Sequence, residues 1–124
     1  MIFASAGHPR FDSGFQQMLR SVFPEFFVNG QLVDIPNDDL IYQIPYLLQR
    51  GTPVLWGYAG HRSRGLKHNG RWFLFYHPSD ITGIWKEGSE GVSQVVAAAN
   101  YRLGVNIIRY AFWQYRNQNP TAIR

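Results

Sequence analysis

The 124-residue chain contains no cysteine. This absence excludes disulfide bonds, zinc sites built on thiolates and a thiol nucleophile. Lysine is also scarce, because arginine supplies 10 of the 12 basic residues. Arginine favours planar, bidentate partners such as carboxylates and phosphates, so the net charge of +4 points to an anionic partner without naming one.

Long apolar runs are absent as well. No run approaches the roughly 20 residues of a membrane span. The opening MIFASAGHP lacks the basic region and the apolar length of a signal peptide, so we expect a soluble chain, or one whose export signal was lost upstream. Hydrophobic residues make up 45% of the chain and aromatic residues 16%. That composition predicts one globular domain with a thick core or a face that binds a partner.

The apolar spacing predicts an α/β chain. Asp12 or Ser13 is the expected N-cap of a first amphipathic helix. The expected elements are, in chain order, a strand at Ile2–Ala4, a helix over residues 12–23, short strand or turn pieces at Leu32–Ile35 and Leu40–Ile44, and a long helix over residues 92–116.

The stretch SRGLKHNGRWFLFYHP gives the clearest β signal. Asn69-Gly70 favours a type I′ turn, because both of its residues tolerate positive φ. We expect residues 64–68 and 71–76 to pair antiparallel. The apolar run after the turn predicts a central strand that is covered on both faces. Simple alternation along this strand places Phe73 and Phe75 on one face of the sheet, and Trp72 and Leu74 on the other face.

The polar turn AGHPRFD follows the first expected strand. Such a turn brings His8, Arg10 and Asp12 to the carboxyl edge of a sheet, where open α/β folds bind ligands. The alternative, which we favour, is purely structural. In it Gly7 permits the turn, Asp12 caps the helix and Arg10 is solvated.

The segment HPSDITGIW follows the central strand. A ligand at that edge would contact His77, Asp80 and Trp85. The structural alternative, which we favour slightly, is an Asx-turn at Asp80 with Trp85 filling the core. Together the two loops raise a rival function, a hydrolase or transferase that uses His8, Asp12 and Asp80 on a small polar substrate.

A basic cluster occupies GHRSRGLKHNGR, with aromatic residues nearby. This pattern suits phosphate or single-stranded nucleic acid. Nothing in it matches a nucleic-acid module, so we favour a solvated hairpin and expect no DNA partner. The candidate anion-binding residues are Arg62, Arg64, Lys67 and Arg71.

We expect no metal site and no cofactor. The four histidines lack the H-x-x-x-H spacing of a metal site, and no thiol joins them. A serine triad assembled from Ser5, His8 and Asp80 lacks the G-x-S-x-G elbow that would support it.

Four segments occur in the order found in a known family: FDSGFQQMLRSVFPE, LVDIPNDDLIYQIPY, RGLKHNGRWFLFYHPSDITGIW and YRLGVNIIRYAF. They resemble the bacterial domain-of-unknown-function family DUF4159, which is grouped with class I glutamine amidotransferase-like folds. The resemblance implies a flavodoxin-like three-layer domain with a β-hairpin and a long C-terminal helix. This chain would form about its second half, entering at a mid-sheet strand. Amidotransferase relatives carry a nucleophilic cysteine where this chain has FASAGH, so that chemistry is excluded.

The residues and the resemblance together favour a non-catalytic binding or assembly domain. The resemblance alone implies that this domain is part of a bacterial, envelope-associated protein complex. The compartment would be the periplasm or envelope if the resemblance holds, and otherwise the cytoplasm, with membrane association only through partners. The closing stretch holds more aromatic residues than one helix face can bury against a small sheet. We therefore expect the chain to bury an interface above roughly 1,000 Å² against another chain or copy. The candidate interface residues are Tyr110, Phe112, Trp113 and Tyr115.

Overall fold

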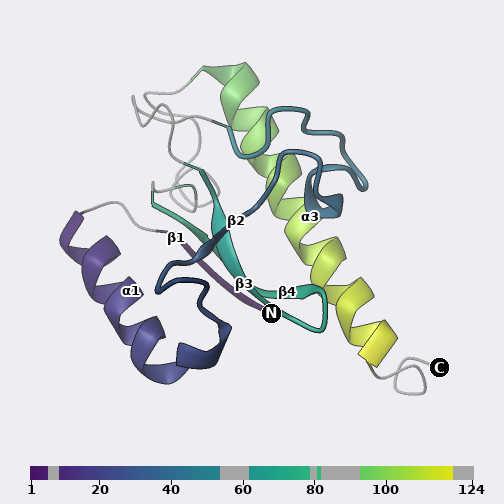
Figure 1. Ribbon diagram of the computed structural model, residues 1–124. Coiled ribbons are helices and arrows are strands. Elements are labelled where there is room, and N and C mark those ends of the chain that lie inside the picture. The colour runs from purple at the N-terminus through teal and green to yellow at the C-terminus, as the bar shows by residue number, and fades with distance from the viewer. Residues whose placement is uncertain (6–8, 54–61, 79–80, 82–92, 119–124) are drawn as a thin grey trace.

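A four-stranded mixed sheet lies between the helices α1 and α3 (Figure 1). The computed structural model describes residues 1–5, 9–53, 62–78, 81 and 93–118. In chain order, the elements are β1 (Ile2–Ser5), α1 (Pro9–Val22), the 3₁₀ turn η1 (Pro24–Phe26), β2 (Val33–Asp34), the 3₁₀ turn η2 (Leu40–Tyr42), β3 (Arg64–His68), β4 (Arg71–His77) and α3 (Gln94–Gln118).

The strand order in the sheet is β1-β4-β3-β2. β1 runs parallel to β4, while β3 pairs antiparallel with both β4 and β2. The expectation that the chain enters at a buried, mid-sheet strand is therefore wrong for the described residues. Among the described strands, β1 pairs with β4 alone and takes an end position in the strand order, and the Ile2 side chain is 44% exposed. The longer apolar strand β4 takes the central place instead.

The hairpin prediction is confirmed. β3 and β4 pair antiparallel across Asn69-Gly70, and both turn residues have positive φ, 52° at Asn69 and 74° at Gly70. β4 lies between β1 and β3, with side chains buried on both faces as its apolar run predicted.

The predicted pairing of side chains on the two faces of β4 is wrong, because the hairpin contains a β-bulge. Leu66 pairs with Leu74. Lys67 then pairs with Trp72, which leaves Phe73 as the extra residue of the bulge. The alternation of β4 therefore shifts by one residue. Trp72 and Phe75 face α3, whereas Phe73, Leu74 and Tyr76 pack in the cluster on the α1 side.

Two hydrophobic clusters cover the two faces of the sheet. On one face, Leu19 and Phe15 of α1 pack with Leu74 and Tyr76. The opposite face holds the larger cluster, which combines strand residues with η2 and α3. Its members from α3 are Ala97, Leu103, Ile107 and Tyr110.

Both predicted helices are present. α1 begins at Pro9 rather than at residue 12, because proline fits the first turn of a helix. Asp12 therefore lies inside the first turn and is not the N-cap. α3 begins one residue after Ser93, whose hydroxyl accepts the Val96 backbone N–H at 3.2 Å as a helix cap.

The segment around η2 is tied to α3 and to the hairpin. Asp39 caps η2 through the Ile41 backbone N–H and also accepts the Trp72 indole N–H at 2.8 Å. The Asn106 amide of α3 donates to the carbonyls of Ile41 and Tyr46 at 2.9 and 2.8 Å. Its oxygen accepts the Tyr46 backbone N–H at 3.0 Å. Asn106 thus closes the loop after η2 onto the helix.

Candidate functional site

The sequence predicted a ligand site at the carboxyl edge of the sheet, but the described members of that site lie on opposite faces of the sheet. His8, Asp80 and Trp85 lie outside the described residues. Asp12 contacts Tyr76, on the α1 side. His77 is the next residue of β4, and its side chain lies on the other side, bonded to Ser63.

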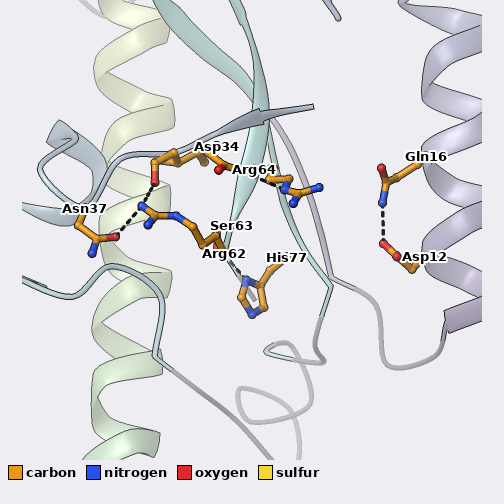
Figure 2. A network of polar contacts seen from close by, with 9 residues as sticks. Asp12, Gln16, Asp34, Asn37, Arg62, Ser63, Arg64 and His77 are labelled. Carbon is orange, nitrogen blue, oxygen red and sulfur yellow. Dashed lines mark hydrogen bonds and ion pairs between the residues drawn. The ribbon is translucent and has the colours of Figure 1, made fainter. Parts of the chain in front are cut away.

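Figure 2 shows this separation. Asp12 and Gln16 lie together on α1, away from Ser63 and His77. Arg10, the remaining described member of the set, is exposed at the start of α1. The described members therefore do not converge on one ligand.

On the α1 side, a carboxylate anchors the helix to the central strand. The Tyr76 hydroxyl donates to Asp12 Oδ1 at 2.5 Å, and the Gln16 amide donates to the same oxygen at 3.0 Å. Burial raises the pKa of Tyr76, and its hydrogen bond to Asp12 raises this pKa further. The hydroxyl therefore stays protonated and keeps donating to the carboxylate.

On the other side, a chain of hydroxyl groups ends at His77. The Tyr42 hydroxyl lies 2.9 Å from Thr52 Oγ1, which lies 2.5 Å from Ser63 Oγ. Ser63 Oγ in turn lies 2.9 Å from His77 Nδ1. Burial raises the pKa of Tyr42, while hydrogen bonds to Thr52 and Ser63 act in the opposite direction.

This hydrogen-bonded network contains a serine–histidine pair, but the pair is inaccessible to solvent. Ser63 and His77 are each 2% exposed. A hydroxyl buried to that degree does not meet a substrate, so the hydrogen bonds hold the segments at Thr52 and Ser63 against β4. No local sequence pattern predicts this network, because its four members come from four separate places in the chain.

The candidate anion-binding residues are engaged within the chain. Arg62 donates to the Ile35 carbonyl and to Asn37 Oδ1, and Arg64 pairs with Asp34 at 3.0 Å (Figure 2). The remaining two lie over aromatic rings. Lys67 Nζ is 4.5 Å from the Trp72 ring centroid, and the Arg71 guanidinium is 5.4 Å from that of Trp113.

The four basic residues thus point to four different partners and do not form a cradle for one phosphate. A metal centre is not formed either in the parts of the chain that the structure describes, since no three histidine or acidic side chains gather there.

The candidate interface residues on α3 differ in exposure. Tyr110 belongs to the core, where its hydroxyl accepts the Trp72 backbone N–H at 2.9 Å. Phe112 and Trp113 are 63% and 41% exposed. The side chain of Tyr115 lies outside the described set. Of the three members whose side chains are described, Phe112 and Trp113 are therefore surface residues and Tyr110 is not.

The sequence prediction missed a longer apolar row on α3. Tyr101, Val105 and Ile108 are 45%, 45% and 60% exposed, and Phe112 continues the row. Their spacing of four, three and four residues was the available signal, because it places all four on one side of a helix. α1 carries a shorter exposed row, formed by Phe11, Met18 and Val22.

A hollow of about 370 Å³ lies between this row and the edge strand β1. Almost all of its surface is apolar. Its lining residues are Phe3, Tyr101, Gly104, Val105, Ile107 and Ile108. Phe3 of β1 and the outer side of α3 therefore line one continuous apolar depression.

None of the described helices combines the length and the apolar character needed to cross a bilayer. A mixed sheet between helical layers, with an apolar depression beside β1 and α3, defines a three-layer α/β domain. The family model for the domain of unknown function DUF4159 matches residues 1–112, and the chain belongs to this family. Searches of curated proteins and of solved structures found no match to the chain.

Proposed function

We propose that the chain is a non-catalytic docking domain that binds another polypeptide along β1 and the outer side of α3. The observation that carries this proposal is the apolar hollow of about 370 Å³ between Phe3 and the exposed row of α3. Exposed apolar surfaces of this kind mark sites of association, because covering them removes apolar area from water.

The polar groups support a binding role rather than a catalytic one. The Asp12 carboxylate is held by Tyr76 and Gln16, and Ser63 is buried against His77. Groups engaged in this way stabilise the fold and are not presented to a substrate.

Two further parts of the proposal rest on the family resemblance. We propose that the domain is related to the flavodoxin-like, glutamine amidotransferase-like folds and matches the second half of such a domain. The parallel β1–β4 pair between helical layers supports that relation. The resemblance also suggests the setting, a bacterial protein complex associated with the envelope.

Sedimentation velocity of the purified chain at increasing micromolar concentration tests the docking role. We expect concentration-dependent association, because an uncovered apolar face also pairs with copies of itself. Ile108→Asp should leave a monomer, since it places a charge in the exposed row. Val95→Asp is the matched control, because Val95 is 80% exposed on the same helix but outside the row.

The control should associate like the unmodified chain, and both variants should show unchanged circular dichroism. A chain that stays monomeric at all concentrations, with no loss of apolar dye binding in Ile108→Asp, would contradict the docking role.

A further inference from the structure

The exposed row of α3 has the spacing of a coiled-coil seam. Tyr101, Val105, Ile108 and Phe112 follow one another at intervals of four, three and four residues. In a heptad written abcdefg, these positions are d, a, d and a. The same register assigns position d to Tyr115 by its place in the sequence. The outer side of α3 is thus patterned to receive a second helix.

The positions beside this seam differ in charge and size. Arg102, Arg109 and Arg116 occupy successive e positions, and all three are exposed. The g positions on the opposite flank hold small residues: Gly104, Ala111 and Ala97, of which Ala97 is buried in the core. Gly104 lines the hollow beside β1, so a helix can approach closely on that flank, while arginines line the other.

The arginine row has no acidic counterpart within the described structure. α3 contains no aspartate or glutamate over its 25 residues. The one ion pair among the described residues joins Arg64 to Asp34, on the hairpin and β2. Arg102 lies 5.7 Å from the Tyr46 ring centroid and takes part in no ion pair among the described residues.

The groups packed beside the arginine row add no carboxylate to it. Arg109 borders a small hollow with Leu40 and Ile44 of the η2 segment. Asp39 of the same segment already accepts bonds from Trp72 and Ile41. Arg71 lies near Trp113 and extends the positive charge toward the end of α3.

We propose that the partner is an amphipathic helix with an apolar a/d seam and acidic flanking residues, which packs along α3 in a coiled-coil arrangement. This inference rests on the proposed docking role and adds the chemistry of the partner. Residues at e and g select partners in coiled coils through charge. A second copy is a weaker match than an acidic helix, because antiparallel pairing sets Arg102, Arg109 and Arg116 against like charges, and parallel pairing offers them only Ala and Gly.

Synthetic peptides test this selection directly. The probes are two fluorescein-labelled helical peptides of about four heptads with identical leucine seams. One peptide carries glutamate at every e and g position, and the other carries lysine at the same positions. Fluorescence anisotropy with the full chain should show about tenfold tighter binding of the glutamate peptide at low salt. Added salt should reduce the difference, because the charges are exposed.

Charge reversal supplies a second readout that misfolding cannot imitate, because a misfolded variant would lose binding to both peptides. Arg102→Glu combined with Arg109→Glu should reverse the preference toward the lysine peptide. Arg20→Glu combined with Arg50→Glu, which changes two exposed arginines outside α3, is the matched control and should keep the original preference. Ile108→Asp should weaken binding of both peptides.

Equal binding of the two peptides would overturn this inference and leave the docking role standing. So would self-association through Ile108 that the glutamate peptide does not displace. Binding to phosphatidylserine-containing vesicles in preference to the glutamate peptide would overturn it in favour of a lipid surface. A chain that is monomeric and binds neither peptide would contradict the docking role as well.

Discussion

Gly65 of β3 lies directly against the indole ring of Trp72 across the hairpin. A Cβ atom on Gly65 would come within 2.8 Å of that ring and would also collide with the Leu74 carbonyl oxygen. Gly65 does not have positive φ. A glycine is needed at this position because there is no room for a side chain, not because of the backbone conformation. The missing side chain leaves room for the buried Trp72 ring, whose indole N–H donates to Asp39.

Gly65→Ala should therefore destabilise the protein by about 3 kcal/mol or more, since both obstacles belong to the packed hairpin. Gly14→Ala is the matched control. Nothing lies within 4 Å of a Cβ at Gly14, which is inside α1, so this change should stabilise by about 0.5–1 kcal/mol. Urea denaturation followed by tryptophan fluorescence measures both. Equal effects of the two changes would contradict the packing described for Gly65.

Tyr76→Phe should lower the free energy of unfolding by about 1–3 kcal/mol at neutral pH, because it removes a hydrogen bond to the Asp12 carboxylate. Tyr46→Phe is the control, since Tyr46 is 44% exposed and the substitution retains the aromatic ring. It should have little effect. Thermal or urea denaturation distinguishes the two variants.

The same tyrosine predicts a dependence on pH. The pKa of Tyr76 is raised above the ordinary value of 10.0, so the folded state holds this proton more tightly than the unfolded state. The resulting stability is fully present below about pH 10 and is lost as the pH rises above it. Burial also raises the pKa values of Tyr42 and Tyr110. Tyr76→Phe should therefore reduce the alkaline loss without abolishing it, and an unchanged slope would contradict this role.

Asn106→Asp should destabilise by about 3 kcal/mol or more. The change replaces two N–H donors by a carboxylate oxygen that faces the carbonyls of Ile41 and Tyr46, and Asn106 is fully buried. Asn37→Asp makes the same chemical change where the side-chain oxygen accepts from Arg62, so it should be neutral or slightly stabilising. Denaturation midpoints give the comparison. An Asn106→Asp variant as stable as the unmodified chain would show that the hydrogen bonds from Asn106 to the loop after η2 are not needed.

Local sequence signals predicted much of the fold. Asn69-Gly70 specified the hairpin because both residues favour the required turn, and the apolar run after it specified the central strand. The bulge at Phe73 escaped prediction, because a continuous apolar run carries no mark of an extra residue. The start of α1 was misplaced because Asp12, a good cap in isolation, is bonded to Tyr76 instead.

The candidate site was harder to predict for the same reason. The partners of His77 and Asp12 are distant in the chain, and no local pattern identifies them. The exposed row of α3 did carry a signal in its spacing. Composition drew attention to the closing aromatics instead, and Tyr110 among them proved to be a core residue.

The pairing of β1 with β4 has a consequence for how the chain folds. Ile2 pairs with Leu74, whereas the hairpin ladder closes within residues 64–77. Closing so long a loop costs more chain entropy than closing a two-residue turn, so we expect the hairpin to form early and β1 to join the sheet late. Amide hydrogens of β1 should then exchange with solvent through a partial opening that leaves the hairpin intact.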